Sequence, residues 1–431
     1  MPLSLPGRRV AIIAGTRTPF ARAGSLLRGL SAIELGKMAV SELVHRTNLD
    51  VGAIDLLVFG TVVPSVLAPN IAREIALMPL LPKNVQAWSV SRACASANQA
   101  ITDAADQIVL GQATVAIAGG AESLSTVPIL HSRGFSDVLV AASRAKTLGA
   151  RLAAFAKLRP KDFIPITPAI AEVTTGESMG QSAEKMAKLN AIPRREQDEL
   201  ALASHLNAAK GTDDGRLTAE IAPAFIPPRY APAMTEDNGI RRDTNIEQLS
   251  ALKPVFDRRY GSVTAGNSSP LTDGAAAVLL MREDRAKALG YEPLAYLRAY
   301  AYAAINPGEQ LLQAPVLAAP VALARAGLSL KDMDLVEMHE AFAAQVLSNL
   351  RGFESPYWAQ RAGFREPVGE VDRSRLNVMG GSIALGHPFG ATGARITTTL
   401  VNELARRGGQ FGLMTVCAAG GLGFAMVVER A

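Results

Sequence analysis

The chain has two cysteines. Both have small neighbours and lie at the end of a predicted element, a kind of position from which a side chain can act in catalysis. From Ala97 the apolar positions of residues 90–101 fall at helical spacing, so Cys94 is expected at or just before a helix N-terminus. Unpaired N–H groups and the helix dipole favour a thiolate there and lower the thiol pKa. Cys94 is therefore a candidate nucleophile, although a cysteine taken alone is more often an inert core thiol.

A histidine lies in a glycine-rich stretch, residues 377–395, that continues into a predicted helix. Pro388 keeps the residue before it out of the helical region, so His387 is expected to project from a loop. A glycine-rich loop before a helix can also bind phosphate, and that alternative stays open for the loop alone. Beside a nucleophilic cysteine, His387 predicts a Cys–His activation pair.

Two further polar positions end predicted buried strands. His339 follows the strand that ends at Met338, where α/β proteins bind ligands, although a lone histidine is as often structural. Cys417 ends the next such strand and precedes a glycine turn at residues 418–421. The backbone N–H groups of that turn are suited to stabilise an oxyanion, which makes Cys417 a second candidate rather than a plain core thiol.

Composition limits the class of protein. With 431 residues and 48% hydrophobic residues, the chain has room for at least two domains with a large core. The net charge of +5 is spread along the chain and aromatic residues make up 5%, so nucleic acid is not an expected partner. Two distant cysteines are unlike a secreted disulfide scaffold. We expect no signal peptide in residues 1–13, no membrane span and a cytoplasmic location.

The elements around these residues follow an α/β pattern. Ser31 and Glu34 form a capping box at the start of a helix. Apolar runs predict strands at residues 9–15, 54–60, 113–120, 273–281 and 412–416. Strands that alternate with helices predict a mostly parallel sheet covered on both faces. Residues 331–339 repeat the pattern of residues 51–60, and the strand at 412–416 repeats that at 115–118, which predicts an internal duplication.

Residues 128–254 interrupt this pattern, because prolines multiply and only a helix near residues 196–209 is periodic. We expect an inserted, loop-rich domain there, between one half made of residues 1–127 plus 255–290 and a second half made of residues 291–431. Within the insertion, residues 138–161 carry six basic and no acidic side chains, with an apolar stripe at helical spacing: Leu148, Leu152 and Phe155. A solvated helix is favoured; membrane contact, partner contact and ligand phosphates stay open.

Four stretches in this order resemble the thiolases along nearly the whole chain: residues 90–97, 264–268, 377–395 and 417–421. The resemblance implies an α/β protein with the five-layered αβαβα fold, built from two duplicated halves and a loop domain that helps to bind coenzyme A. It also implies coenzyme A as co-substrate, no tightly bound cofactor and no metal. Ser269 matches a position that contacts the pantetheine arm.

The resemblance also assigns roles to the candidate residues. Carried over by position, Cys94 is the acylated nucleophile, His387 is the base that activates it, and Cys417 is the acid/base at the α-carbon. The backbone N–H groups of Cys94 and Ala419 form one oxyanion hole. His387 and a water held near His339 form the other. Ala419 replaces the commoner glycine, but its backbone donor survives that change.

One difference from the usual thiolase motifs indicates a more specific function. Most thiolases carry asparagine where His339 stands, and the His-Glu-Ala-Phe motif at residues 339–342 resembles the β-subunit of the fatty-acid-oxidation trifunctional complex and its bacterial counterparts. This predicts thiolytic cleavage of 3-ketoacyl-CoA in a homodimer or tetramer, with a partner α-subunit that carries hydratase and dehydrogenase activities. The alternatives are a biosynthetic acetoacetyl-CoA thiolase, a related ketoacyl synthase and a non-catalytic acyl-CoA-binding member. A cysteine protease would need neither the second thiol nor the duplication.

Overall fold

The computed structural model describes residues 9–166 and 171–431; residues 1–8, where we expect no signal peptide, lie outside the described residues. The strands are β1 (Val10–Arg17), β2 (Ala21–Arg22), β3 (Leu56–Gly60), β4 (Gln86–Val90), β5 (Val115–Glu122), β6 (Thr272–Arg282), β7 (Ala295–Ala304), β8 (Leu335–Met338), β9 (Phe411–Ala418) and β10 (Leu422–Arg430). They form one sheet in the order β4-β3-β5-β6-β1-β7-β10-β9-β8, with β2 beside β6.

The sheet is mixed, and the prediction of a mostly parallel sheet is wrong. Among the strand pairs of the described residues, only β3–β4, β3–β5 and β8–β9 are parallel. The pairs that involve β1, β6, β7 and β10 are antiparallel. For β9 and β10 the reason is local: a three-residue turn at residues 419–421 joins them and leaves room for antiparallel pairing alone.

The predicted internal duplication is confirmed by the topology. The strand order β3-β5-β6-β1 of the first half returns as β8-β9-β10-β7 in the second, with the same parallel and antiparallel pairs. The equivalent strands β1 and β7 pair at the centre, where Val10 lies opposite Leu297. The two halves therefore meet along the equivalent strands β1 and β7.

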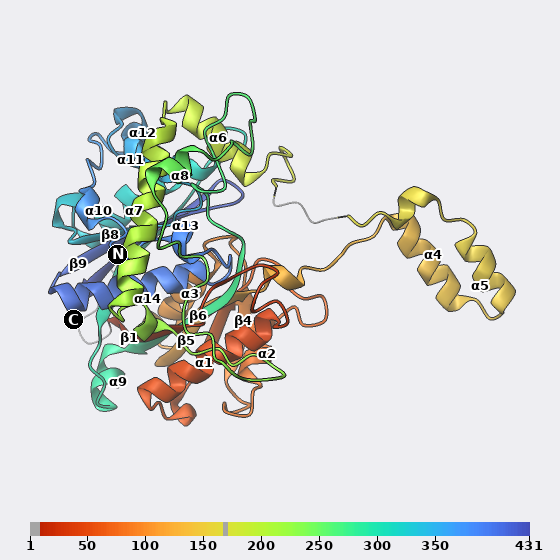
Figure 1. The fold of residues 1–431 in the computed structure, drawn as a ribbon. Helices are drawn as coiled ribbons and strands as arrows, with labels where there is room; N and C mark the ends of the chain where they lie inside the picture. Colours follow the sequence, from red (N-terminus) through yellow and green to blue (C-terminus); the bar gives the residue numbers. More distant parts are fainter. Residues whose placement is uncertain (1–8, 167–170) are drawn as a thin grey trace.

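Helices cover the sheet in layers (Figure 1). They are α1 (Ala32–Thr47), α2 (Ile71–Ala76), α3 (Ser96–Val109), α4 (Arg133–Arg144), α5 (Leu148–Phe155), α6 (Met179–Leu189), α7 (Arg194–Asp213), α8 (Ile246–Ser250), α9 (Glu283–Ala288), α10 (Pro315–Ala326), α11 (Ala343–Phe353), α12 (Pro356–Arg361), α13 (Ser382–Leu385) and α14 (Thr392–Arg407). One core joins α3 and α14 to strands of both halves. Separate cores lie under α1 and α2 and under α10 to α12, which gives the five-layered αβαβα arrangement.

The predicted helices and strands are present where the hydrophobic periodicity of the sequence is strong. Ser31 caps α1 and Glu34 completes the capping box. The helix expected near residues 196–209 is present as α7. β1 runs two residues further than expected, because Thr16 and Arg17 pair with β6 instead of turning. Among the described residues, no helix is both long and apolar enough to cross a bilayer.

The basic stretch at residues 138–161 is two helices rather than one. Figure 1 shows α4 and α5 packed on each other and standing away from the rest of the chain. Seven basic and two acidic side chains lie between Arg133 and Phe163, an excess equal to the net charge of the whole chain. The apolar stripe of α5 is solvent-exposed: Leu148, Leu152 and Phe155 are 72%, 63% and 43% exposed. We call α4 and α5 together the cationic hairpin.

Candidate active site

A tight turn between β4 and α3 presents Cys94. Ala93 has a φ of +44°, a left-handed conformation that costs a residue with a Cβ about 1 kcal/mol. The Ser96 hydroxyl accepts from the backbone N–H of Arg92 and donates to the carbonyl of Ala93, at 2.8 and 2.6 Å, and so fixes the turn. Cys94 itself is half-buried and lies just before the first residue of α3, as predicted.

The loop between α13 and α14 carries His387 into the same region. The Thr392 hydroxyl donates to the Pro388 carbonyl at 3.1 Å, and its oxygen lies 2.6 Å from Nδ1 of His387. Because the single hydroxyl proton is engaged by that carbonyl, we infer that Nδ1 of His387 is the donor. A ring that holds its proton on Nδ1 leaves Nε2 unprotonated, which is the form a base requires. In the first half, Glu122 at the end of β5 accepts from the backbone N–H of Gly390 at 3.0 Å and holds this loop in place.

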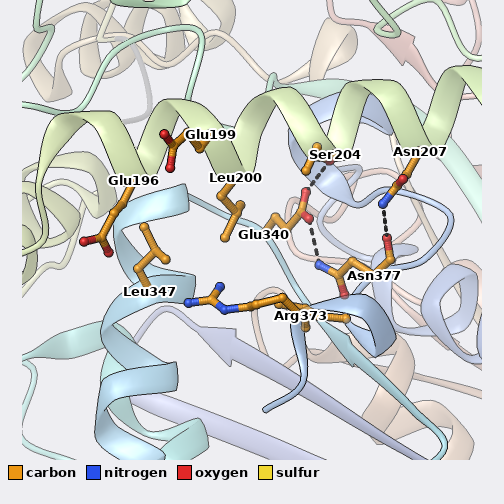
Figure 2. Close-up of a pocket in the computed structure, with 11 residues that line it drawn as sticks. Glu196, Glu199, Leu200, Ser204, Asn207, Glu340, Leu347, Arg373 and Asn377 are labelled. Atoms are coloured by element: carbon orange, nitrogen blue, oxygen red, sulfur yellow. Dashed lines mark hydrogen bonds between the residues drawn. The ribbon is translucent and has the colours of Figure 1, made fainter. Parts of the chain in front are cut away.

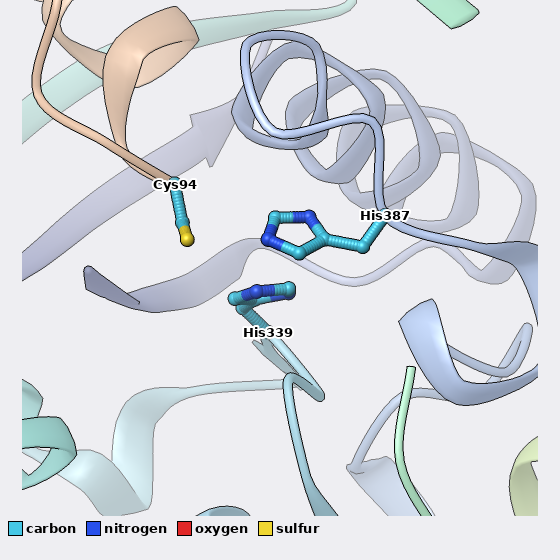
Figure 3. A group of neighbouring side chains, drawn as sticks. All are labelled: Cys94, His339 and His387. Carbon is cyan, nitrogen blue, oxygen red and sulfur yellow. The ribbon is translucent and has the colours of Figure 1, made fainter. Parts of the chain in front are cut away.

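His339 completes a cluster of three side chains (Figure 3). It follows β8, where its backbone N–H donates to Thr415 of β9 at 2.9 Å. The centroids of the His339 and His387 rings are 4.1 Å apart. Sγ of Cys94 and one ring nitrogen from each histidine lie within 4.8 Å of one another. Sulfur and imidazole ligands also suit Zn²⁺, and the prediction of a metal-free site stays a prediction.

Cys417 and Ala419 approach Cys94 from β9 and the turn after it. The backbone N–H of Ala419 lies near enough to the sulfur of Cys94 to lower the pKa of this thiol. Cys417 is 1% exposed, and the two sulfurs are close enough that a charge on Cys94 raises the pKa of Cys417. The structure therefore brings together all five positions predicted from the two halves.

The electrostatics differ from the sequence prediction. Burial raises the pKa of the Cys94 thiol to about 12, and the N–H groups of Ala419 and Cys94 offset this only in part. Burial also raises the pKa of Cys417 well above its usual range. The prediction of a lowered pKa at Cys94 is thus wrong, because desolvation outweighs the backbone dipoles at this thiol.

Both imidazoles are also uncharged at neutral pH. Burial and the positive charge of Arg395 lower the pKa of His387 to about 3. Burial, His387 and Arg395 lower the pKa of His339 in the same direction. The Nε2 atoms of both rings have no hydrogen-bond partner among the described residues. The resting cluster is therefore neutral, with two unengaged ring nitrogens beside the thiol.

Ser269 lies outside the cluster, in a neighbouring cavity of about 290 Å³. Leu271 forms a bridge with His387, so this cavity adjoins the cluster. Arg22, His205 and Arg241 also line it, and the backbone N–H of Arg241 donates to Nδ1 of His205 at 3.2 Å. Burial and the two neighbouring guanidinium groups lower the pKa of His205 to about 4. Two guanidinium groups in the lining of one cavity are suited to a phosphorylated ligand.

The comparisons with known proteins agree with this architecture. The family models for the N-terminal and C-terminal thiolase domains match residues 10–284 and 291–430. The chain belongs to the thiolase family. It is 54% identical over 424 residues to the 3-ketoacyl-CoA thiolase of Pectobacterium atrosepticum, covering 98% of this chain and 97% of the relative. It is 52% identical, with the same coverage, to the 3-ketoacyl-CoA thiolase of Yersinia enterocolitica.

Solved thiolase structures share the fold over their whole length. The Bacillus anthracis acetyl-CoA acetyltransferase superposes with a TM-score of 0.84 at 32% identity, covering 98% of this chain and 99% of that one. The human mitochondrial 3-ketoacyl-CoA thiolase in complex with CoA superposes with a TM-score of 0.83 at 32% identity, covering 100% and 99%. The predicted family and the thiolase fold are confirmed.

Residues that sequence reasoning left without a role hold this thiolase site together. Glu340 accepts hydrogen bonds from Ser204 of α7 and from Asn377 (Figure 2). Both are 2.7 Å long, and the three residues line a separate cavity of about 410 Å³. This network fixes the residue that follows His339. Glu340, Ser382 and Thr392 all lie in the quoted motifs, but nothing in their spacing distinguishes a supporting hydroxyl from a core one.

Proposed function

We propose that this thiolase cleaves 3-ketoacyl-CoA with coenzyme A, giving acetyl-CoA and an acyl-CoA two carbons shorter. The observation that carries the proposal is the convergence of Cys94, His387 and Cys417, which come from distant parts of the chain, around one point. Two relatives that match almost end to end are named 3-ketoacyl-CoA thiolase. The degradative direction rests on those names and on the His-Glu-Ala-Phe motif, since the same groups serve condensation.

In the proposed first half-reaction, His387 Nε2 takes the proton of Cys94 and the sulfur adds to the 3-keto carbon. The backbone N–H groups of Cys94 and Ala419 then hold the alkoxide, and the oxyanion hole at the two histidines receives the thioester oxygen on which the enolate charge develops. The Cα–Cβ bond breaks and the electron pair leaves as the enolate of acetyl-CoA. Cys417 protonates that carbon, and its raised pKa suits the task because the thiol is protonated before the step.

In the proposed second half-reaction, the thiol of coenzyme A gives its proton to the Cys417 thiolate and attacks the acyl group on Cys94. The C–S bond to Cys94 breaks, the sulfur takes back its proton from His387, and the shortened acyl-CoA leaves in a ping-pong sequence. We place the pantetheine arm in the cavity that Ser269 lines, because it adjoins His387 and carries two guanidinium groups for phosphates. Residues 128–254 are proposed as the domain that helps to bind coenzyme A, with His205 and Arg241 as its contributions.

The test of this function is direct. Purified protein is incubated with a 3-ketoacyl-CoA and the mass of the Cys94 peptide is followed. We expect an acyl adduct on Cys94 in the wild type and neither adduct nor turnover in Cys94→Ala. A scan from acetoacetyl-CoA to long 3-ketoacyl-CoA substrates separates a degradative enzyme from an acetoacetyl-CoA thiolase. If no substrate of any chain length gave an adduct, the result would favour a non-catalytic acyl-CoA-binding protein.

We also propose partners for this thiolase in the cytoplasm: a second copy of the chain, in a dimer or tetramer, and an α-subunit with hydratase and dehydrogenase activities. The cationic hairpin is the proposed attachment surface. Its apolar stripe is not covered by any of the residues that the structure describes, and its charge fits an acidic partner surface or anionic lipid headgroups. Co-purification of the native protein, compared with a Leu148→Ser/Leu152→Ser variant, tests this surface, and catalysis by the purified variant should be unchanged.

A further inference from the structure

Behind the two histidines lies a buried cation that the proposed mechanism does not use. Arg395, in the first turn of α14, is 1% exposed. Its Nη2 donates to the hydroxyl of Ser382 at 2.9 Å, while Nε and Nη1 have no hydrogen-bond partner among the described residues. Glu337, also buried, is the carboxylate that acts on it most strongly. Burying a guanidinium group with so few hydrogen bonds costs free energy of folding, so a functional reason for Arg395 is expected.

The Ser382 hydroxyl links that cation to His339. Its oxygen lies 3.0 Å from Nδ1 of His339 and 2.9 Å from Nη2 of Arg395. A guanidinium can only donate, so it occupies a lone pair of the serine oxygen. Within the described residues, Nδ1 of His339 is the acceptor in reach of the serine proton. If Nδ1 carried a proton instead, the buried serine proton would lose its acceptor, at about 1–3 kcal/mol.

We propose that Arg395 and Ser382 are positioning residues that hold His339 as the tautomer protonated on Nε2, so that this ring offers an N–H donor to the substrate oxygen beside the base His387. The two imidazoles then have opposite roles at the same point: His387 Nε2 is the acceptor that takes the thiol proton, and His339 Nε2 is a donor. The ring itself then supplies the donor that the resemblance assigns to a water held near His339. The inference rests on the proposed function and refines one of its oxyanion holes.

Histidine-selective nitrogen NMR on the full-length protein tests the proposal, because proton–nitrogen correlations distinguish the two tautomers of a neutral imidazole. The chain has five histidines, and loss of one set of signals in His339→Asn assigns that ring. We expect Nε2 of His339 to carry the proton in the wild type. We expect Ser382→Ala to shift its population towards the Nδ1-protonated form. Ser348→Ala removes another fully buried hydroxyl, which has no hydrogen-bond partner within residues 9–166 and 171–431, and should leave the His339 signals unchanged.

Kinetics supply a second readout. Ser382→Ala should lower kcat about 10-fold, the scale seen when an orienting partner of a functional histidine is lost, and should leave KM within about twofold. Arg395→Lys keeps a hydrogen-bond donor near Ser382 and should retain the wild-type tautomer of His339. Arg395→Met removes the donor and should lose that tautomer. If Arg395→Met does not fold, the result for Ser382→Ala decides alone.

The result that overturns the inference is an Nδ1-protonated His339 in the wild type, or a tautomer that Ser382→Ala does not change. The acyl adduct on wild-type Cys94 tests the proposed function separately. Formation of the adduct together with an Nδ1-protonated His339 removes only this inference, whereas absence of the adduct removes the function on which it rests.

Discussion

The neutral resting site predicts how Cys94 responds to pH. A pKa of about 12 lies about 3 units above that of an ordinary thiol, so the thiolate costs about 4 kcal/mol more to form than in a free cysteine. Its thiolate population at pH 8 is then about 1,000-fold lower. A more basic thiolate is also more nucleophilic, which with a Brønsted slope near 0.45 returns a factor of about 20. Cys94 should therefore react with iodoacetamide about 50-fold more slowly than a free thiol.

The assay measures alkylation of the Cys94 peptide by mass spectrometry between pH 6 and 10, with glutathione as the reference thiol. We expect the logarithm of the rate to rise by about one per pH unit throughout, because the titration lies above this range. A cysteine ionised by pairing with an imidazolium would behave differently, with a rate that is flat above about pH 5. A plateau anywhere below pH 9 would refute the argument that burial dominates at this thiol.

Three further predictions concern other parts of the molecule. Cys417→Ser should still form the acyl adduct on Cys94 from a simple acyl thioester but should lose carbon–carbon cleavage, because a hydroxyl is too weak an acid for the enolate; equal loss of both steps contradicts this role. Ala419→Pro removes one oxyanion donor and should lower kcat about 100-fold or more, whereas Ala419→Gly keeps the donor and should stay near the wild type. Asp237→Ala leaves the fully buried Arg17 without its bidentate partner at 2.7 and 2.8 Å, and should cost about 3–5 kcal/mol in urea unfolding; a loss below 1 kcal/mol would contradict it.

The parts of the fold that sequence predicts are those in which one short segment decides its own structure. The capping box at Ser31 and the buried strands need only their own residues and their apolar spacing. Sheet direction is different, because it depends on which strands become neighbours over long distances. The pairing of β6 with β1 and β5, more than 150 positions away, leaves no local mark in any of the three segments.

In the candidate site, too, the features set by local sequence could be predicted and those set by long-range packing could not. Cys94, His387 and Cys417 could be found because residue type, small neighbours and turn signals mark each of them locally. Their pKa values could not be found, because desolvation is set by everything packed around a group. The close approach of the 387–390 loop to β5 is similarly hidden: a Cβ on Gly120 would lie 1.8 Å from the carbonyl oxygen of Gly390, so two glycines with no sequence relation keep His387 in place.

A neutral site is well suited to a reaction that moves one negative charge through a closed space. In the proposed cycle that charge passes from sulfur to alkoxide to enolate, and each form needs a donor only while it exists. Cys94 and Cys417 are protonated at rest because burial penalises any earlier charge. Arg395 stays cationic beside both imidazoles and lowers the pKa of each. An imidazolium formed on His387 therefore returns its proton readily, so the same burial that slows the free thiol also drives the cycle back to its neutral start.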